Sequence, residues 1–136
     1  MYFKILELSI LIKKLLKVVK RMVLLITENW WPSGKTEEVG KKYLEAVKKY
    51  PDDRSISKSI LRGAIWTTDE GMHSITVDSI KPGKVKEAMD NATKQELVMS
   101  SIEGWKYNIH IAYDLAEAMP LIGLKAPERA EAPEIY

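Results

Sequence analysis

Six segments of regular periodicity follow one another between residues 23 and 114. Four are short and rich in β-branched or aromatic residues, and two have apolar residues at helical spacing. The predicted strands cover residues 23–31, 58–68, 72–80 and 103–114, and the predicted helices lie between Pro32 and Pro51 and between Pro82 and Met99. The segment Asp69–Gly71 is a turn signal of the hairpin type. The order is therefore β-α-β-β-α-β.

This order is the split β-α-β arrangement of the ferredoxin-like fold, of the α+β class. Right-handed crossovers place both helices on one face of a four-stranded antiparallel sheet with the spatial order 4-1-3-2. A chain of 136 residues suits one such domain. We assign it to residues 22–119, after a leading segment at 1–21 and before a Pro-, Ala- and Glu-rich tail at 120–136.

The amino-acid composition excludes several kinds of functional site. The chain has no cysteine, which excludes disulfides, thiolate metal sites and cysteine nucleophiles. Only His73 and His110 offer imidazole ligands, so we expect no metal centre and no cofactor. Residues 1–21 carry a net charge of +5, which leaves −3 for the rest of a chain whose formal charge is +2. A mildly acidic body argues against nucleic-acid binding.

The leading segment has the pattern of an amphipathic helix, with one apolar stripe and lysines opposite it. Lys4 and Glu7 interrupt the apolar run, which is too short to span a bilayer. Three interpretations remain open. The segment lies on a membrane surface, it packs on the body or on a second subunit, or it is an upstream extension of a chain that starts at Met22. We expect a cytoplasmic protein, or one peripheral to a membrane through residues 1–21.

The faces of the sheet follow from the rule that each strand gives its more apolar side to the helices. The first strand is ambiguous by this rule, because it is apolar on both faces, and we place its even-numbered residues on the open side. The residues expected toward the helices are Val23, Leu25, Thr27 and Asn29; Leu61, Gly63 and Ile65; Ile75 and Val77; and Trp105, Tyr107, Ile109 and Ile111. Those expected on the open face are Leu24, Ile26, Glu28 and Trp30; Arg62, Ala64 and Trp66; Ser74, Thr76 and Asp78; and Lys106, Asn108 and His110.

The expected open face combines tryptophans and isoleucines with ionisable side chains. An apolar patch of this size usually contacts something, and buried charges such as Glu28 and Arg62 are costly unless they are paired. Both properties fit a second sheet that packs across this face. The sequence thus predicts a homodimer, formed sheet to sheet, with a partly polar cavity between the sheets.

The order of elements and this mixed face resemble the dimeric α/β-barrel superfamily, over residues 22–119. The stretches "LLITENWWP", "GAIWTTDEGMHSITVDS" and "YNIHIAYDLAEAMPLI" are most similar to an uncharacterised group within it, of the domain-of-unknown-function 3303 kind. The resemblance implies two ferredoxin-like subunits packed sheet against sheet. It implies no specific activity.

Three functions stay open at this point. The first is binding of a small molecule in the cavity, with Glu28, Trp30, Arg62, Trp66 and Asp78 as ligand-binding residues. The second is a cofactor-free monooxygenase or isomerase, in which His110 moves a proton and Asn108 or Arg62 stabilises oxyanion charge. The third is a module whose only role is dimerisation.

Overall fold

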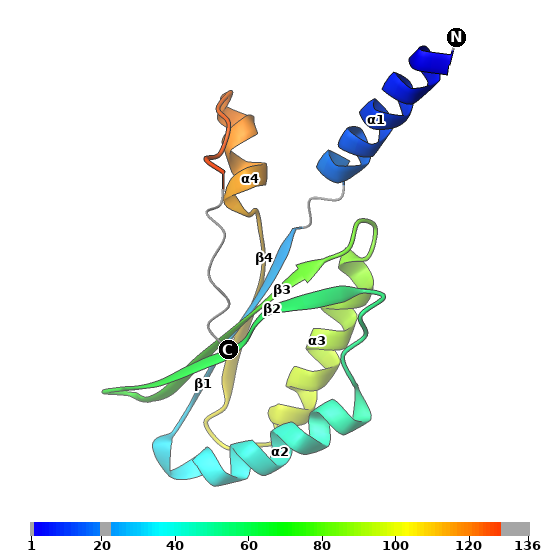
Figure 1. Ribbon diagram of the computed structural model, residues 1–136. Helices are drawn as coiled ribbons and strands as arrows, with labels where there is room; N and C mark the ends of the chain where they lie inside the picture. Colours follow the sequence, from blue (N-terminus) through cyan, green and yellow to red (C-terminus); the bar gives the residue numbers. More distant parts are fainter. Residues whose placement is uncertain (1, 20–22, 129–136) are drawn as a thin grey trace, which may run out of the picture.

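The computed structural model describes residues 2–19 and 23–128. It is an α+β structure built on a four-stranded antiparallel sheet (Figure 1). The strands are β1 (Leu24–Trp31), β2 (Ser57–Thr68), β3 (Gly71–Ile80) and β4 (Lys106–Ala112). The helices are α1 (Tyr2–Val19), α2 (Thr36–Lys49), α3 (Val85–Met99) and α4 (Leu115–Ala118), with short 3-10 turns η1 (Ser33–Lys35) and η2 (Met119–Ile122).

The strands lie in the order β2-β3-β1-β4, and every neighbouring pair is antiparallel. Read from the other edge, this is the predicted order 4-1-3-2, which is therefore confirmed. The two central strands, β1 and β3, are far apart in sequence but pair along their whole length, from Leu24 opposite Ser79 to Trp31 opposite Met72. The face on which a central side chain lies therefore depends on the register of this pair.

Local sequence explains where the elements begin and end. Helix α2 has Glu37 and Glu38 in its first turn and Lys48 and Lys49 in its last, which suits the helix dipole, and it stops before Pro51. The hairpin between β2 and β3 closes on Gly71, whose φ of 124° suits glycine. A Cβ there would lie 2.6 Å from the backbone oxygen of Trp31.

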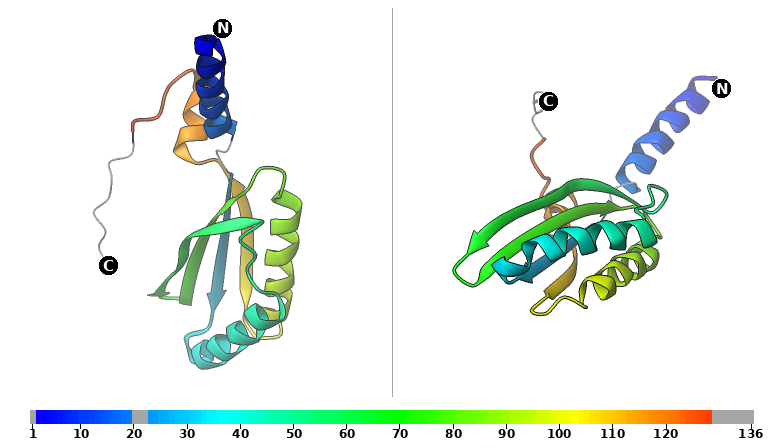
Figure 2. Two further views of the ribbon diagram at one scale, coloured as in Figure 1. Left: turned by 45° about the vertical axis from the view of Figure 1, so that its right-hand side comes forward. Right: turned by 90° about the horizontal axis from the view of Figure 1, so that it is seen from below.

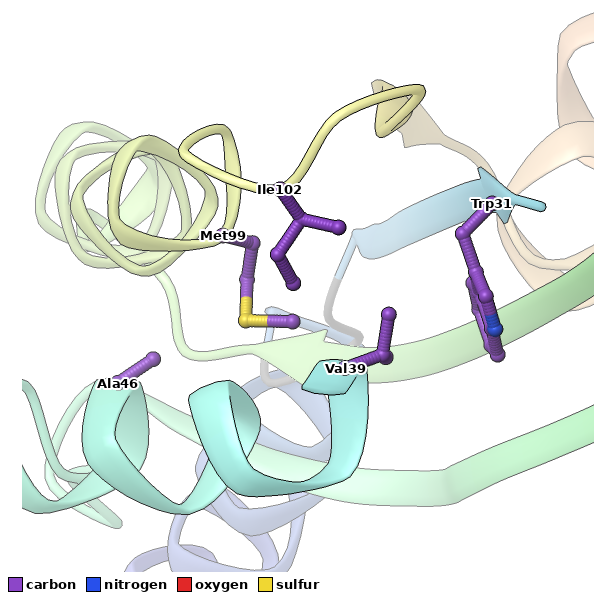
Figure 3. Close-up of a cluster of buried hydrophobic side chains, with 5 residues drawn as sticks. All are labelled: Trp31, Val39, Ala46, Met99 and Ile102. Atoms are coloured by element: carbon purple, nitrogen blue, oxygen red, sulfur yellow. The ribbon is translucent and has the colours of Figure 1, made fainter. Parts of the chain in front are cut away.

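The core consists of two clusters that share strand β1 and helix α3. In the first, Trp31 of β1 packs with Val39 and Ala46 of α2 and with Met99 and Ile102 (Figure 3). In the second, Leu25 of β1 packs with Ile80 and with Ala88 of α3; the partly buried neighbours are Val23, Ile56, Met89, Ala92 and Ile109. The odd-numbered residues of β1 thus contact side chains of both α2 and α3, which lie beside the sheet in Figure 2.

Outside these clusters, α1, α4 and η2 project from the sheet (Figure 1). The predicted helix in the leading segment is present as α1, and residues 20–22 lie outside the described part. Between residues 4 and 12 of this helix the apolar side chains are exposed, including Ile5, Leu8 and Leu11. Within the residues described, no helix combines the length and apolar character needed to cross a bilayer. Of the predicted tail, residues 129–136 also fall outside the description.

Candidate functional site

Strand β1 has the predicted orientation. Leu25, Thr27, Asn29 and Trp31 are all buried, whereas the even-numbered residues between them are only partly covered. Residues paired across antiparallel strands share a face of the sheet. Tyr107 and Ile109 of β4 are opposite Asn29 and Thr27, so they lie on the helix side as predicted.

The predicted orientation of β3 is wrong. Ser74 is opposite Asn29, Thr76 is opposite Thr27 and Asp78 is opposite Leu25. These three polar residues therefore lie on the helix side, and Ile75 and Val77 lie on the helix-free face. The prediction failed because it assumed an apolar interface between helices and sheet. In fact this part of the interface is polar, and the helix-free face carries the apolar side chains.

Strand β2 follows the prediction in part. Ala64 and Trp66 lie on the helix-free face, opposite Ile75 and His73, and Ile65 is opposite Ser74 on the helix side. The strand is irregular between Ser59 and Leu61 and between Leu61 and Ala64. Leu61 pairs with Val77 within this irregular stretch but lines a cavity on the helix side, where it was expected. Arg62, which was expected on the open face, lines the same cavity.

The helix-free face is consequently more apolar than the sequence indicated. Paired residues cross it in rows: Trp66, His73, Trp30 and Lys106; Ala64, Ile75, Glu28 and Asn108; Val77, Ile26 and His110; and Lys58, Ser79, Leu24 and Ala112. Apolar residues predominate at the centre of this face on β1, β2 and β3, whereas the polar residues are Glu28, Lys58, His73, Ser79 and those of edge strand β4. None of these side chains is fully buried within the chain.

One end of this face holds an aromatic cluster. The His73 ring stacks on the Trp30 ring, with centroids 4.5 Å apart and an interplanar angle of 17°. The centroid of the Trp66 ring lies 4.3 Å from that of His73. Nε2 of His73 is shielded from solvent and has no hydrogen-bond partner among the described residues. Both tryptophans were among the predicted ligand-binding residues, whereas His73 was not among the predicted site residues.

The predicted catalytic residues His110 and Asn108 lie on β4, which forms one edge of the sheet. His110 and Asn108 of β4 are both exposed and share the helix-free face, opposite Ile26 and Glu28 respectively. Of the seven predicted site residues, the structure thus places five on this face: Glu28, Trp30, Trp66, Asn108 and His110. It separates them from Arg62 and Asp78.

Arg62 and Asp78 instead line a cavity of about 100 Å³ between the sheet and the helices. Polar side chains from every surrounding element reach it, including Thr27 and Asn29 of β1, Thr76 of β3 and Gln95 and Glu96 of α3. Tyr43, Met99 and Trp105 complete its apolar wall. A water molecule occupies about 30 Å³ in the liquid, so the cavity can hold several waters or a small organic group.

Glu96 is the most buried acid in this site, with 6% of its surface exposed. Trp105 Nε1 donates to its Oε2 at 2.9 Å. The Asn29 amide suits its neighbours when its nitrogen faces Glu96, where it donates to Oε1 at 2.9 Å and to Oε2 at 3.1 Å. Burial raises the pKa of Glu96 to about 7, and the hydrogen bond from Trp105 limits the rise.

Asp78 is the second acid of the cavity and is half-buried. Burial, with the nearby Asp52 carboxylate, raises the pKa of Asp78 to about 6. Two acids with raised pKa values in one cavity are typical of a functional site, because a bound ligand can supply the interactions that the interior lacks. Glu96 was missed at the sequence level. It continues the buried stripe of Ala88, Ala92 and Met99 at helical spacing, so a charged residue at that position was the available signal.

No protein-family model matches the chain, and no curated protein matches it either.

Proposed function

We propose that the protein is a small-molecule-binding homodimer of the dimeric α/β-barrel type. In this proposal, each ferredoxin-like subunit carries α2 and α3 on one side of its sheet and pairs with a second subunit through the other side. The ligand occupies the cavity beneath the sheet rather than a cavity between the sheets, because that is where Arg62 and Asp78 lie with Glu96.

One observation carries the proposal, namely the orientation of β3. Its polar residues Ser74, Thr76 and Asp78 face the helices, and Ile75 and Val77 face away from them. A strand that only stabilised a monomer would have the opposite orientation, because burying a carboxylate is costly and leaving isoleucine and valine only half-buried forgoes hydrophobic stabilisation. Both costs are offset if the polar side binds a ligand and the apolar side is covered.

A second copy is a suitable cover. Four strands about 4.8 Å apart and eight residues long at about 3.3 Å each give a face of roughly 500 Å² in projection. This area is of the same order as the roughly 800 Å² of accessible surface that each partner buries in a standard interface. Two such sheets can pack face to face with their side chains interdigitated.

Sedimentation velocity on matched variants tests the assembly. The unmodified chain is expected to sediment as a dimer at micromolar concentration. Ile75→Glu places a charge at the centre of the helix-free face and is expected to give a monomer, since an unpaired buried charge weakens association by several kcal/mol. A monomeric unmodified chain would contradict the proposal.

Leu97→Glu is the matched control. Leu97 lies on α3 and is 62% exposed. The same substitution there is expected to leave the dimer intact. Circular dichroism melts of both variants show whether Ile75→Glu still folds, which separates loss of assembly from loss of structure.

A further inference from the structure

The cavity beneath the sheet opens toward a second, larger hollow. A surface groove of about 680 Å³ shares Asp52, Ser59, Arg62 and Asp78 with the cavity. Four shared lining residues make the two spaces neighbours on either side of Asp78. A ligand longer than the cavity would therefore extend into this groove.

The two spaces differ in charge. The cavity is lined by the carboxyl groups of Asp52, Asp78 and Glu96, and Arg62 is the only basic residue in its lining. The groove adds three further basic residues, Arg54, Lys58 and Lys81, and no further acid. Of the acids, Glu96 lines only the inner cavity and Asp52 and Asp78 line both spaces, whereas the three further basic residues line only the groove. We call these three residues and Arg62 the basic mouth.

Glu96 accepts a hydrogen bond from Trp105, and Asp52 accepts one from Gln95, whereas the side chains of Asp78 and of the basic residues have no such partner among the described residues. Asp78 forms no hydrogen bond or ion pair with the residues described, which include the whole of the sheet. In that same part of the chain, Arg54, Lys58, Arg62 and Lys81 take part in no ion pair within 4.0 Å. A half-buried carboxylate without a donor gains more from a cationic ligand than a solvated one does, because competing water is scarce there.

The geometry points to a bipolar ligand: a small molecule with a cationic, hydrogen-donating head group for Asp78 and Glu96 and an anionic group for the basic mouth. A primary ammonium joined by a short chain to a carboxylate or phosphate has this chemistry. The ammonium would enter the cavity, where Thr27 and Thr76 hydroxyls also lie, and the anion would remain between Arg62 and the groove lysines. This inference rests on the proposed function, because it names the class of small molecule that the proposed site would bind.

Three probes of matched length test the inference: 4-aminobutanoate, butylammonium and butanoate. Binding to the full-length protein is followed by the indole N–H resonance of Trp105, which reports on the cavity because this group donates to Glu96 at 2.9 Å. Trp105→Phe identifies the resonance among the four tryptophans. We expect 4-aminobutanoate to bind about tenfold or more tightly than butylammonium, which corresponds to about 1.4 kcal/mol for the anionic contact. Butanoate is expected to leave the resonance unmoved.

Two substitutions assign the ends of the ligand. Asp78→Asn is expected to weaken both amines at least tenfold. Arg62→Gln is expected to weaken 4-aminobutanoate alone, toward the affinity of butylammonium. Lys41→Gln on α2, outside both spaces, is the control and should change neither affinity.

Each outcome has a distinct meaning. Equal binding of 4-aminobutanoate and butylammonium would overturn the role of the basic mouth, and preferential binding of butanoate would overturn the polarity, while both leave small-molecule binding in the cavity intact. An unmoved Trp105 resonance with all three probes would overturn the ligand class. Sedimentation of the same samples tests the dimer separately, so failure of the ligand class and failure of the assembly are distinguishable.

Discussion

The indole nitrogen of Trp105 donates a 2.9 Å hydrogen bond to the Glu96 carboxylate, inside the interface between helix α3 and the sheet. An interface of this kind is ordinarily apolar. Here it contains an acid with 6% of its surface exposed, held by an indole and an amide, next to a cavity of about 100 Å³. The next three predictions follow from this polar network.

Glu96 should make stability depend on pH. Burial raises its pKa from 4.5 to about 7, so between these values the native state holds a proton that the unfolded chain has released. The free energy of unfolding is therefore expected to fall as the pH rises from about 4.5 to about 7, by on the order of 3 kcal/mol. The raised pKa of Asp78 acts in the same direction. Urea unfolding between pH 4.5 and pH 8 measures this.

Glu96→Gln should remove most of this dependence, because the amide oxygen can still accept from Trp105 and no proton is lost. The variant is expected to gain stability over the unmodified chain at pH 8 and to match it near pH 5. Glu87→Gln, in the exposed first turn of the same helix, is the control and should keep the original slope. An unchanged slope in Glu96→Gln would show that another group is responsible.

Trp105→Phe removes the donor but retains an aromatic ring against Trp31, which stacks on Trp105 at 5.5 Å. The hydrogen bond lowers the pKa of Glu96, so its loss should raise that pKa further. We expect the free energy of unfolding to fall by about 1–3 kcal/mol, and by more at pH 8 than at pH 5, since a charged carboxylate loses most. Tyr113→Phe, at a side chain that is 63% exposed, should have little effect at either pH.

The sequence could predict those features of the structure that the pattern of a single segment determines. The elements and the strand order follow from periodicity and turn signals, and the observed strands match the predicted ones to within a few residues. The orientation of β4 was also predictable, because Ile109 alternates with polar side chains that fit the helix-free face, whereas β1 is apolar on both faces and its local pattern left the orientation ambiguous.

The orientation of β3 was not predictable in the same way. It depends on long-range register, with Thr76 opposite Thr27 and Asp78 opposite Leu25, which no local pattern specifies. The apolar alternation of Ile75 and Val77 indicated the opposite orientation, because a helix-free face that carries apolar residues breaks the rule used to read it. The irregular stretch around Arg62 in β2 was likewise not predictable, because no local pattern specifies its shift in register.

Gly71 should be sensitive to substitution. Its φ is 124°, and a Cβ there would meet the Trp31 backbone oxygen at 2.6 Å. Gly71→Ala is therefore expected to lower the free energy of unfolding by about 2 kcal/mol or more. Gly34→Ala is the control, because a Cβ at Gly34 meets nothing within 4 Å and should leave stability nearly unchanged. Thermal unfolding of the two variants gives the comparison; equal losses would contradict the hairpin geometry.

Removal of residues 1–21 should leave the fold and the proposed dimer intact. Both core clusters lie between residues 23 and 109, and the apolar side chains between residues 4 and 12 of α1 are exposed, among them Ile5 at 65% and Leu11 at 61%. A variant that starts at Met22 is expected to sediment as the full chain does, allowing for its smaller mass. If the shortened chain were monomeric and the full chain dimeric, α1 rather than the sheet would form the interface.

The most direct test of the account is an isotope-filtered nuclear Overhauser experiment on a dimer of one labelled and one unlabelled subunit. It detects only contacts between subunits. We expect cross-peaks from the methyl groups of Ile26, Ile75 and Val77 to the partner. If intersubunit cross-peaks are absent, or arise from other surfaces of the chain, then the helix-free face does not pair with a second copy.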